Sequence, residues 1–217
     1  MRSCKTALFF WILLFLLTMP LVSRAAVPDP TEQMRPFLAK ITKILADKSI
    51  DNDPECSLCQ RVINVAREHF DFREMSKRVL GKQWRKLTPV QQDHFVHLFT
   101  KLLQYAYIGK VKDYSGQAIE FKRQRIRGKR AEVQTLLVDG QRTIPVSYIM
   151  LLEGDQWMIY DVVVEGVSLV RNYMEQFRQI LRKQSFADLE KQLEKKIEEL
   201  EKERLAKIEN KKRSTQP

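Results

Sequence analysis

The sequence contains little of what enzymes need for chemistry. Its 217 residues include 7 glycines, 3 cysteines and 3 histidines, without a phosphate-binding glycine loop, a serine-nucleophile motif or paired cysteines at zinc spacing. His94 and His97 could place two metal ligands on one helix, but no acidic or thiol ligand lies beside them. Asp161 and Glu165 could act as general acid and base, but their position at a predicted strand end favours contacts that fix a turn. We therefore expect no enzyme, no catalytic residue and no metal site.

Long apolar runs are also scarce. The longest, Ala7–Leu17, has 11 residues; it follows the basic residues Arg2 and Lys5 and precedes small residues that end at Ala25. A bilayer-spanning helix needs roughly 20 apolar residues, and this order of features is typical of an export signal. We predict a signal peptide over residues 1–25 that is cleaved near Ala25, with an uncleaved anchor as the alternative.

Acidic residues are fewer than basic residues. The formal net charge is +11, and it falls to +8 when the signal peptide and its three basic residues are removed. Such a balance often indicates nucleic-acid binding, but export argues against a nucleic-acid partner. Anionic lipid headgroups, an acidic protein surface, or a basic surface that is merely solvated remain as explanations.

Only two cysteines, Cys56 and Cys59, follow the predicted signal. In an oxidising compartment they could form a disulfide across one helical turn. A redox site with this spacing belongs to a βαβ unit, and no such pattern surrounds the pair. We therefore favour a local disulfide over a redox or metal site.

Helical periodicity dominates the first half of the chain. Thr31 could cap the first helix, and the sequence Thr88-Pro89-Val90-Gln91 forms a capping box that opens the longest one. Apolar residues recur at spacings of three and four in each predicted helix. The predicted helices cover about residues 31–45, 57–69, 72–80 and 89–114.

The period changes to two after the long helix. Four stretches read as strands, joined by short connections that contain Gly128, Gly140 and Gly154. Consecutive hairpins of this kind give an antiparallel meander. We predict an α+β fold in which N-terminal helices pack on a curved four-stranded sheet, with strands at 119–126, 131–138, 143–152 and 157–164.

The last two strands are apolar on both faces. In the third strand Val146, Tyr148 and Met150 share a face opposite to Ile149 and Leu151. In the fourth strand, strict alternation places one set of side chains on one face and a second set on the other. The first set is Met158, Tyr160, Val162 and Val164, and the second is Trp157, Ile159 and Val163. An ordinary core with a covering helix would explain this pattern, and so would an internal cavity.

Gly166 ends the fourth strand, and Ser168 can cap an amphipathic helix over about 167–183. Beyond it, residues 185–217 alternate Glu and Lys around widely spaced Leu and Ile. This composition predicts a long, charged, solvated helix. The helix could cover the body, pair with a partner or fray.

Several motifs occur together in one order. They are Phe70-Asp71-Phe72, Leu80-Gly81, Trp84-Arg85, the Thr88–Gln91 capping box and DVVVEGVSLVRNYMEQF at 161–177. In this combination the chain resembles the MlaC (Ttg2D) family of periplasmic phospholipid-binding proteins, associated with toluene tolerance. The resemblance implies a cone-shaped, NTF2-like domain over 26–184, with a helical part, a sheet and a closing helix, followed by the tail.

The resemblance also implies a function. Such proteins carry phospholipid between membranes and maintain outer-membrane lipid asymmetry. Their partners are an inner-membrane ABC transporter complex with its lipid-binding ring protein and an outer-membrane lipoprotein complex. The lipid is cargo, and no cofactor is expected. A hopanoid or another apolar lipid is an alternative cargo, and a periplasmic adaptor that binds no lipid is an alternative of another class.

The facing of the predicted elements suggests which side chains would line a cavity between sheet and helices. The family signature does not fix these residues one by one. The expected lining is Leu98, Phe99, Leu102, Val146, Tyr148, Met150, Val162, Val164, Val170 and Tyr173.

Overall fold

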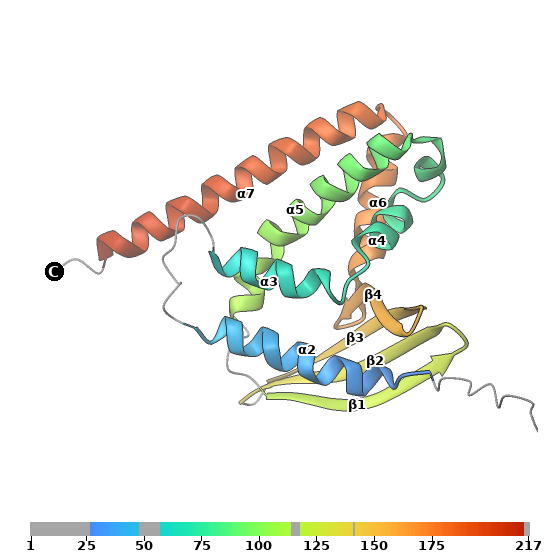
Figure 1. Ribbon diagram of the computed structural model, residues 1–217. Coiled ribbons are helices and arrows are strands. Elements are labelled where there is room, and N and C mark those ends of the chain that lie inside the picture. Colours follow the sequence, from blue (N-terminus) through green and yellow to red (C-terminus); the bar gives the residue numbers. More distant parts are fainter. Residues whose placement is uncertain (1–26, 48–56, 114–117, 141, 215–217) are drawn as a thin grey trace, which may run out of the picture.

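The computed structural model describes residues 27–47, 57–113, 118–140 and 142–214. Helices come first along the chain, the strands of one sheet follow one another, and two helices end the chain (Figure 1). The helices are α2 (Pro30–Leu45), α3 (Ser57–Arg67), α4 (Phe72–Leu80), the 3-10 helix η2 (Gly81–Lys86), α5 (Pro89–Asp113), α6 (Leu169–Leu181) and α7 (Phe186–Ser214). The strands are β1 (Ala118–Arg127), β2 (Arg130–Asp139), β3 (Arg142–Glu153), β4 (Gln156–Val164) and β5 (Val167–Ser168).

Two predictions fall outside the described residues. The signal peptide over residues 1–25 is one of them. The disulfide is the other, because Cys56 and the side chain of Cys59 are not described.

Local polar contacts begin the helices. The capping box is confirmed: the Gln91 amide donates to Thr88 Oγ1 at 3.3 Å, and the Thr88 amide donates to Gln91 Oε1 at 2.9 Å. Thr31, however, is not the cap of α2. The carboxylate of Asp29 accepts two amides of the first turn, while the Thr31 hydroxyl donates to Gln124 Oε1 of β1 at 2.7 Å. The prediction was wrong because a distant strand occupies that hydroxyl.

The sheet is an antiparallel meander in the order β1-β2-β3-β4-β5. Its four predicted strands are confirmed, and the short β5 is additional. Glu165 and Gly166 both have positive φ, of 50° and 82°, which is the requirement of a type I′ hairpin turn. The Glu165 amide also donates to the Pro145 carbonyl at 3.0 Å. The chain therefore turns back on β4 before α6 begins.

A β-bulge in β4 changes which side chains face α2. The pairing of β4 with β3 shifts by one residue at Tyr160. Ile159 and Val162 consequently face the same way, toward α2. Tyr160 faces the other side, where Arg78 Cζ lies 3.8 Å from its ring centre. The predicted grouping of Tyr160 with Val162 and Val164, opposite to Ile159, is therefore wrong.

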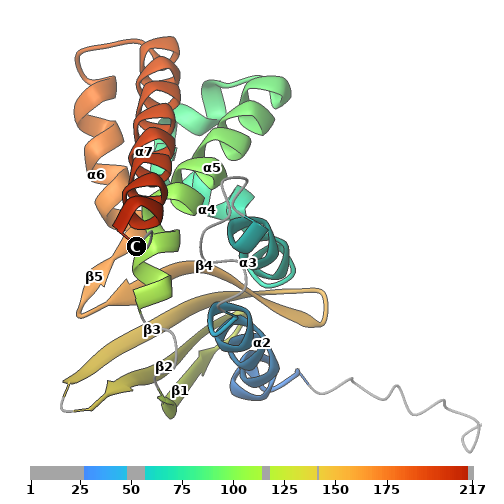
Figure 2. The ribbon, with the colours of Figure 1, turned by 90° about the vertical axis from the view of Figure 1, so that its left-hand side faces the viewer.

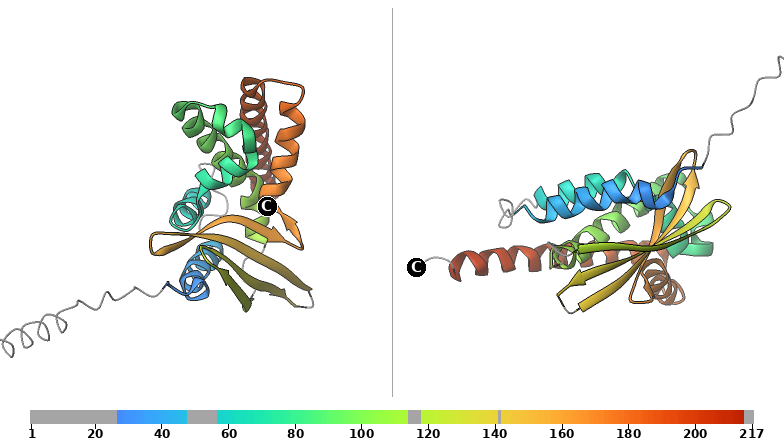
Figure 3. Two further views of the ribbon diagram at one scale, coloured as in Figure 1. Left: turned by 90° about the vertical axis from the view of Figure 1, so that its right-hand side faces the viewer. Right: turned by 90° about the horizontal axis from the view of Figure 1, so that it is seen from below.

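The buried apolar side chains form two clusters on opposite sides of β3 and β4 (Figures 2 and 3). The helical cluster joins α4, α5, α6 and α7 and includes Met75, Val79, Trp84, Phe95, Leu98, Phe99, Leu102, Tyr160, Val170, Tyr173, Phe177 and Leu189. The sheet cluster joins α2 and α3 to the sheet and includes Met34, Phe37, Leu38, Ala131, Val133, Val146, Tyr148, Met150, Trp157 and Ile159.

The first half of α7 covers the body of the protein. Leu189, Leu193 and Ile197 are buried in the helical cluster, and Tyr105 of α5 donates to Glu201 Oε1 at 3.0 Å. Leu205, further along, is exposed. The helix thus packs along α5 at its start and extends beyond the other helices toward its C-terminal end (Figure 1).

Candidate functional site

The inner face of the sheet, defined as the side that faces α2, carries apolar side chains from all four long strands. Cross-strand pairing arranges its side chains in rows. One row is Val133, Tyr148 and Val162; the next is Phe121, Thr135, Val146 and Val164; the last is Ile119, Leu137 and Ile144.

Burial of the inner face changes from one end to the other. Trp157 and Ile159 are 0% exposed near the β3–β4 hairpin. In the last row Ile119 and Ile144 are only partly buried, and Val164 is 39% exposed. Ile126, which pairs with Ala131 on the β1 edge, is 45% exposed. The apolar surface is therefore closed beside Trp157 and Ile159, and it reaches solvent at the β1 edge and toward the opposite end of the sheet.

The few polar groups on this face are satisfied and uncharged. The Tyr148 hydroxyl is hydrogen-bonded to Thr135, and burial raises the pKa of Tyr148 to about 12. Thr135 Oγ1 donates to the Val146 carbonyl at 3.3 Å. Because burying an unpaired polar group costs free energy, these bonds make the face compatible with hydrocarbon. The guanidinium of Arg35, which comes from α2, lies over this face, with Cζ 4.5 Å from the ring centre of Phe121.

Helix α2 is held against the sheet by polar bonds at its N-terminal end. Gln33 and Trp157 exchange two bonds of 2.8 and 2.9 Å, and Trp157 Nε1 donates to the Pro28 carbonyl at 2.7 Å. Gln124 Nε2 donates to Asp29 Oδ2 at 2.6 Å. We call these contacts the α2 clasp. From Met34 to Leu45, the contact of α2 with the sheet cluster is apolar except at Arg35, whose Cζ lies 4.5 Å from the ring centre of Phe121.

Phe70 connects the two apolar clusters. It packs against both of them, and its ring centre lies 6.1 Å from Phe37 and 5.8 Å from Phe72. The backbone beside it adds to the edge of β4: the Ile159 amide donates to the His69 carbonyl at 2.7 Å. Burial lowers the pKa of His69, so its ring is neutral at neutral pH where it contacts Phe37.

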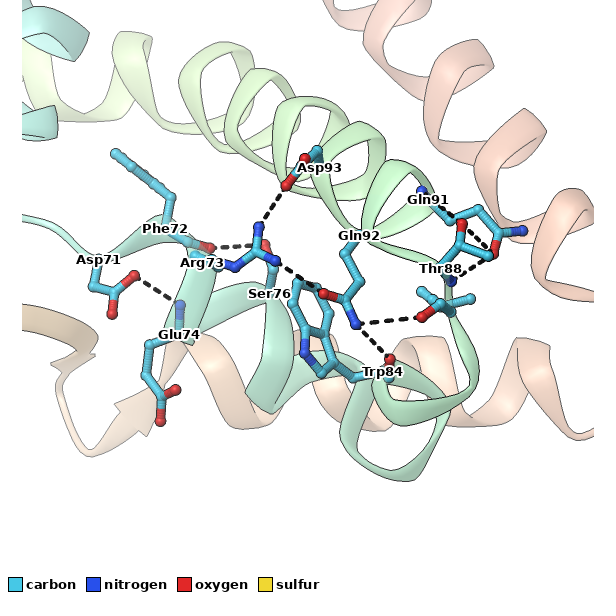
Figure 4. A network of polar contacts seen from close by, with 11 residues as sticks. Asp71, Phe72, Arg73, Glu74, Ser76, Trp84, Thr88, Gln91, Gln92 and Asp93 are labelled. Carbon is cyan, nitrogen blue, oxygen red and sulfur yellow. Dashed lines mark hydrogen bonds and ion pairs between the residues drawn. The ribbon is translucent and has the colours of Figure 1, made fainter.

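The other resemblance motifs hold helices together. Asp71 Oδ1 accepts the Glu74 amide at 2.8 Å and caps α4. Arg73 reaches across to Asp93 and Gln92 of α5, and Gln92 Nε2 in turn donates to the Trp84 carbonyl at 3.1 Å (Figure 4). These side chains therefore position α4, η2 and α5 and form no reactive centre.

Asp161 performs the structural role that the sequence favoured. Its two carboxylate oxygens accept the Ser168 hydroxyl at 2.5 Å and the Val170 amide at 2.9 Å. Ser168 Oγ itself accepts the Arg171 amide at 3.0 Å, which confirms it as the cap of α6. A carboxylate at a helix N-terminus is stabilised by the helix dipole, and here it links the sheet to the helical layer.

The ten side chains predicted to line a cavity do not meet in one place. The sheet cluster contains Val146, Tyr148 and Met150, with Val162 packed against it, and Val164 lies beside Val146 at the exposed end. The other five belong to the helical cluster, on the far side of β3 and β4: Leu98, Phe99, Leu102, Val170 and Tyr173.

His94 lies beside two acidic residues of α7. His94 Nε2 lies 3.9 Å from both Glu190 and Glu194 of α7, a proximity that sequence could not reveal across nearly 100 residues. No group of three or more His, Cys, Asp or Glu side chains in the described part of the chain is arranged to hold a metal ion. No helix among the described ranges is long and apolar enough to cross a bilayer.

The architecture defines a class of protein: an α+β domain in which helices cover the apolar inner face of an antiparallel meander. The model of the MlaC protein family matches residues 37–195, and the chain belongs to that family.

Individual relatives agree with this assignment. The chain is 26% identical over 191 residues to the intermembrane phospholipid transport system binding protein MlaC of Haemophilus influenzae, covering 83% of this chain and 89% of that protein. It is 26% identical to the toluene tolerance protein ttg2D of Pseudomonas putida, over 57% of this chain and 59% of that one. A phospholipid-binding protein from Ralstonia solanacearum, solved with a phospholipid, shares the fold: the TM-score is 0.70 at 19% identity, over 80% of this chain and 99% of that chain.

Proposed function

We propose that this protein is a periplasmic carrier that holds phospholipid acyl chains on the inner face of its sheet. It moves the lipid between an outer-membrane lipoprotein complex and an inner-membrane ABC transporter complex with its lipid-binding ring protein. One observation carries the proposal beyond family membership: the inner face presents mainly apolar side chains and a neutral Tyr148, and part of this apolar surface reaches solvent. Such a surface accommodates hydrocarbon while a headgroup stays in water.

The proposed contacts are the inner-face residues Val146, Tyr148, Met150, Val162 and Val164. The five helical residues of the expected lining then have another role, which is to hold α5 and α6 together as a base for the sheet. Their burial in the helical cluster supports this division.

The binding energy of two acyl chains decides the release mechanism. Each buried methylene contributes about 0.8 kcal/mol, so a phospholipid represents on the order of 20 kcal/mol before the costs of binding are subtracted. Spontaneous release from such a site is slow. Transfer therefore requires partner complexes that stabilise a more open conformation of the carrier.

Helix α2 is the element that we propose moves. Its polar bonds to the sheet lie in the α2 clasp at its N-terminal end, and the remainder touches the sheet through apolar contacts and through the Arg35 guanidinium over the Phe121 ring. Two exposed ion pairs, Lys40–Glu68 and Arg61–Asp47, join its other half to α3, and such pairs are weak. Opening would pivot α2 about the clasp and widen the exposed end of the inner face.

Native purification followed by organic extraction and mass spectrometry tests the proposal. We expect a phospholipid to leave with the wild-type chain and to be lost in Val162→Trp, where the indole occupies the inner face. Val90→Trp is the matched control, because Val90 is 77% exposed on α5 and the substitution adds the same bulk at the surface.

A folded wild-type chain without lipid would refute the carrier function, and the adaptor alternative would then lead. Extraction of a hopanoid instead of a phospholipid would keep the site and change the cargo. If the carrier lost its lipid to plain vesicles as fast as to vesicles bearing the partner complexes, the release mechanism would be wrong.

A further inference from the structure

The hairpin of β1 and β2 carries the densest positive charge in the sheet. Its residues 122–130 read KRQRIRGKR, with six basic side chains and no acid. Lys122 pairs with Glu120 on its own strand. The side chains of the other five are exposed and make no ion pair with a described residue.

Four of these five lie on one face. Gln124 contacts α2 and therefore points to the inner face. Residues at alternate positions of a strand point the other way, so Arg123, Arg125 and Arg127 lie on the outer face. Arg130 of β2 pairs directly opposite Arg127 and therefore lies on the outer face as well. We call these four residues the arginine ladder.

No described helix covers this part of the outer face. Helix α2 lies on the inner side of β1 and β2, and α4 and α6 pack on β4 at the other edge of the sheet (Figures 2 and 3). Along β1 successive arginines are about 7 Å apart. The ladder is thus a flat, exposed row of cations.

The ladder is costly to the fold by itself. Like charges directly opposite one another in a sheet are destabilising, and Arg127 faces Arg130 in this way. Two described acids lie beside the ladder on this face, and both have other partners: Glu132, opposite Arg125, accepts the Gln134 side-chain amide at 2.7 Å, and Glu120 pairs with Lys122. An external anion layer would relieve this repulsion.

We propose that the arginine ladder docks the protein on a bilayer surface that contains anionic phospholipid. The absence of an apolar centre favours a membrane over a protein, because protein interfaces concentrate their energy in buried aromatic or aliphatic anchors. Side chains across from the ladder are polar, as Gln134 and Glu132 illustrate. Repeated cations on a flat face instead match the diffuse negative potential of headgroups.

This inference goes beyond the proposed function, since docking is measurable whether or not the chain holds a lipid. The mature chain is mixed with vesicles of phosphatidylcholine and phosphatidylglycerol and sedimented. We expect binding that falls as salt rises from about 0.05 M to about 0.5 M, because salt screens exposed charges. Vesicles of phosphatidylcholine alone should not bind it.

A ladder variant with all four arginines changed to Gln is the central test. Each basic residue near an anionic surface contributes about fivefold to partitioning, so we expect a loss of about one hundredfold or more. The matched control, called the α6 variant, removes four exposed charges from α6 and from the two residues after it, as Arg171→Gln, Arg178→Gln, Arg182→Gln and Lys183→Gln. It should lose less than about fivefold.

Two further measurements keep the test decisive. The ladder variant should melt no lower than wild type, because it loses like-charge repulsion. A variant with the four arginines changed to Lys should still bind, because a bilayer responds to charge and not to the guanidinium shape.

Equal loss in the ladder and α6 variants would overturn the proposal, because net charge alone would then explain binding. Failure of wild type to bind anionic vesicles would also overturn it and would indicate an acidic protein as the partner of the ladder. Co-purified lipid is extracted from each variant in parallel. If the ladder variant keeps its lipid but does not dock, both proposals stand; if wild type docks without any lipid, only the carrier function fails.

Discussion

The two apolar clusters differ in how completely they are closed. In the helical cluster Phe95 and Phe99 are 0% exposed, and ring contacts of 5.2 to 6.0 Å join them to Tyr173 and Phe177. The sheet cluster ends in a row of half-buried side chains instead. Dense packing rigidifies a region, whereas a partly solvated apolar face can exchange its contacts. We therefore propose that the helices contribute most of the stability and that the inner face of the sheet is the binding surface.

The same truncation in both clusters tests this division with the largest expected effect. Phe99→Ala should lower the free energy of unfolding by about 3–5 kcal/mol, because it opens a cavity in a closed core. Phe121→Ala removes an identical side chain from the half-buried inner face and should cost about half as much. Urea denaturation measures both losses.

Lipid content of the folded chains completes this comparison. We expect Phe99→Ala to keep its lipid and Phe121→Ala to lose part of it. Equal losses of stability, or lipid lost only from Phe99→Ala, would reverse the roles assigned to the two clusters.

A smaller effect is expected at the joint between the clusters. Asp161→Ala removes the carboxylate that binds Ser168 and Val170 and should destabilise the fold by about 2 kcal/mol, as loss of a partly buried charged cap does. Asp188→Ala removes the carboxylate that accepts the amide and the hydroxyl of Ser185 at the exposed start of α7, and it should cost less. A thermal melt of both variants would show the difference, and equal melting temperatures would contradict a joining role for Asp161.

The smallest expected effect depends on pH and concerns the contact between Glu153 and Asp71. A hydrogen bond with Asp71, which caps α4, raises the pKa of Glu153 at the end of β3 to about 7. The folded state therefore keeps a proton that the unfolded chain loses above its ordinary pKa. This contribution to stability is present at low pH and disappears as the pH rises through about 7.

Glu153→Gln isolates this contribution. The urea midpoint of wild type should fall more than that of the variant between about pH 5 and about pH 8. His69, whose pKa is lowered by burial, titrates in both proteins and cancels in the difference. Parallel midpoint curves would mean that Glu153 and Asp71 do not share a proton.

Much of the fold could be predicted because its determinants are local. The Thr88–Gln91 capping box, the Ser168 cap and the glycines of the hairpins act within a few residues, and each occupies its expected place. The alternating pattern of β3 likewise predicted that Val146, Tyr148 and Met150 share one face, and all three are buried.

The errors have distant causes. Thr31 lost its predicted capping role to Gln124, 93 residues away. The bulge at Tyr160 depends on an aromatic ring that fits against Arg78 and the helical cluster, and a single inserted residue then reversed the facing of Val162. The residues of the expected lining belong to two clusters because periodicity does not reveal on which side of a sheet a helix packs.

The α2 clasp also has a consequence for the order in which the chain folds. Each hairpin of the meander forms from neighbouring residues, but Gln33 must find Trp157, which lies 124 positions later. Local contacts form faster than contacts of long sequence separation. Helix α2 should thus be the last part to become protected from amide hydrogen exchange during refolding. Its apolar face stays exposed to solvent until β4 has formed.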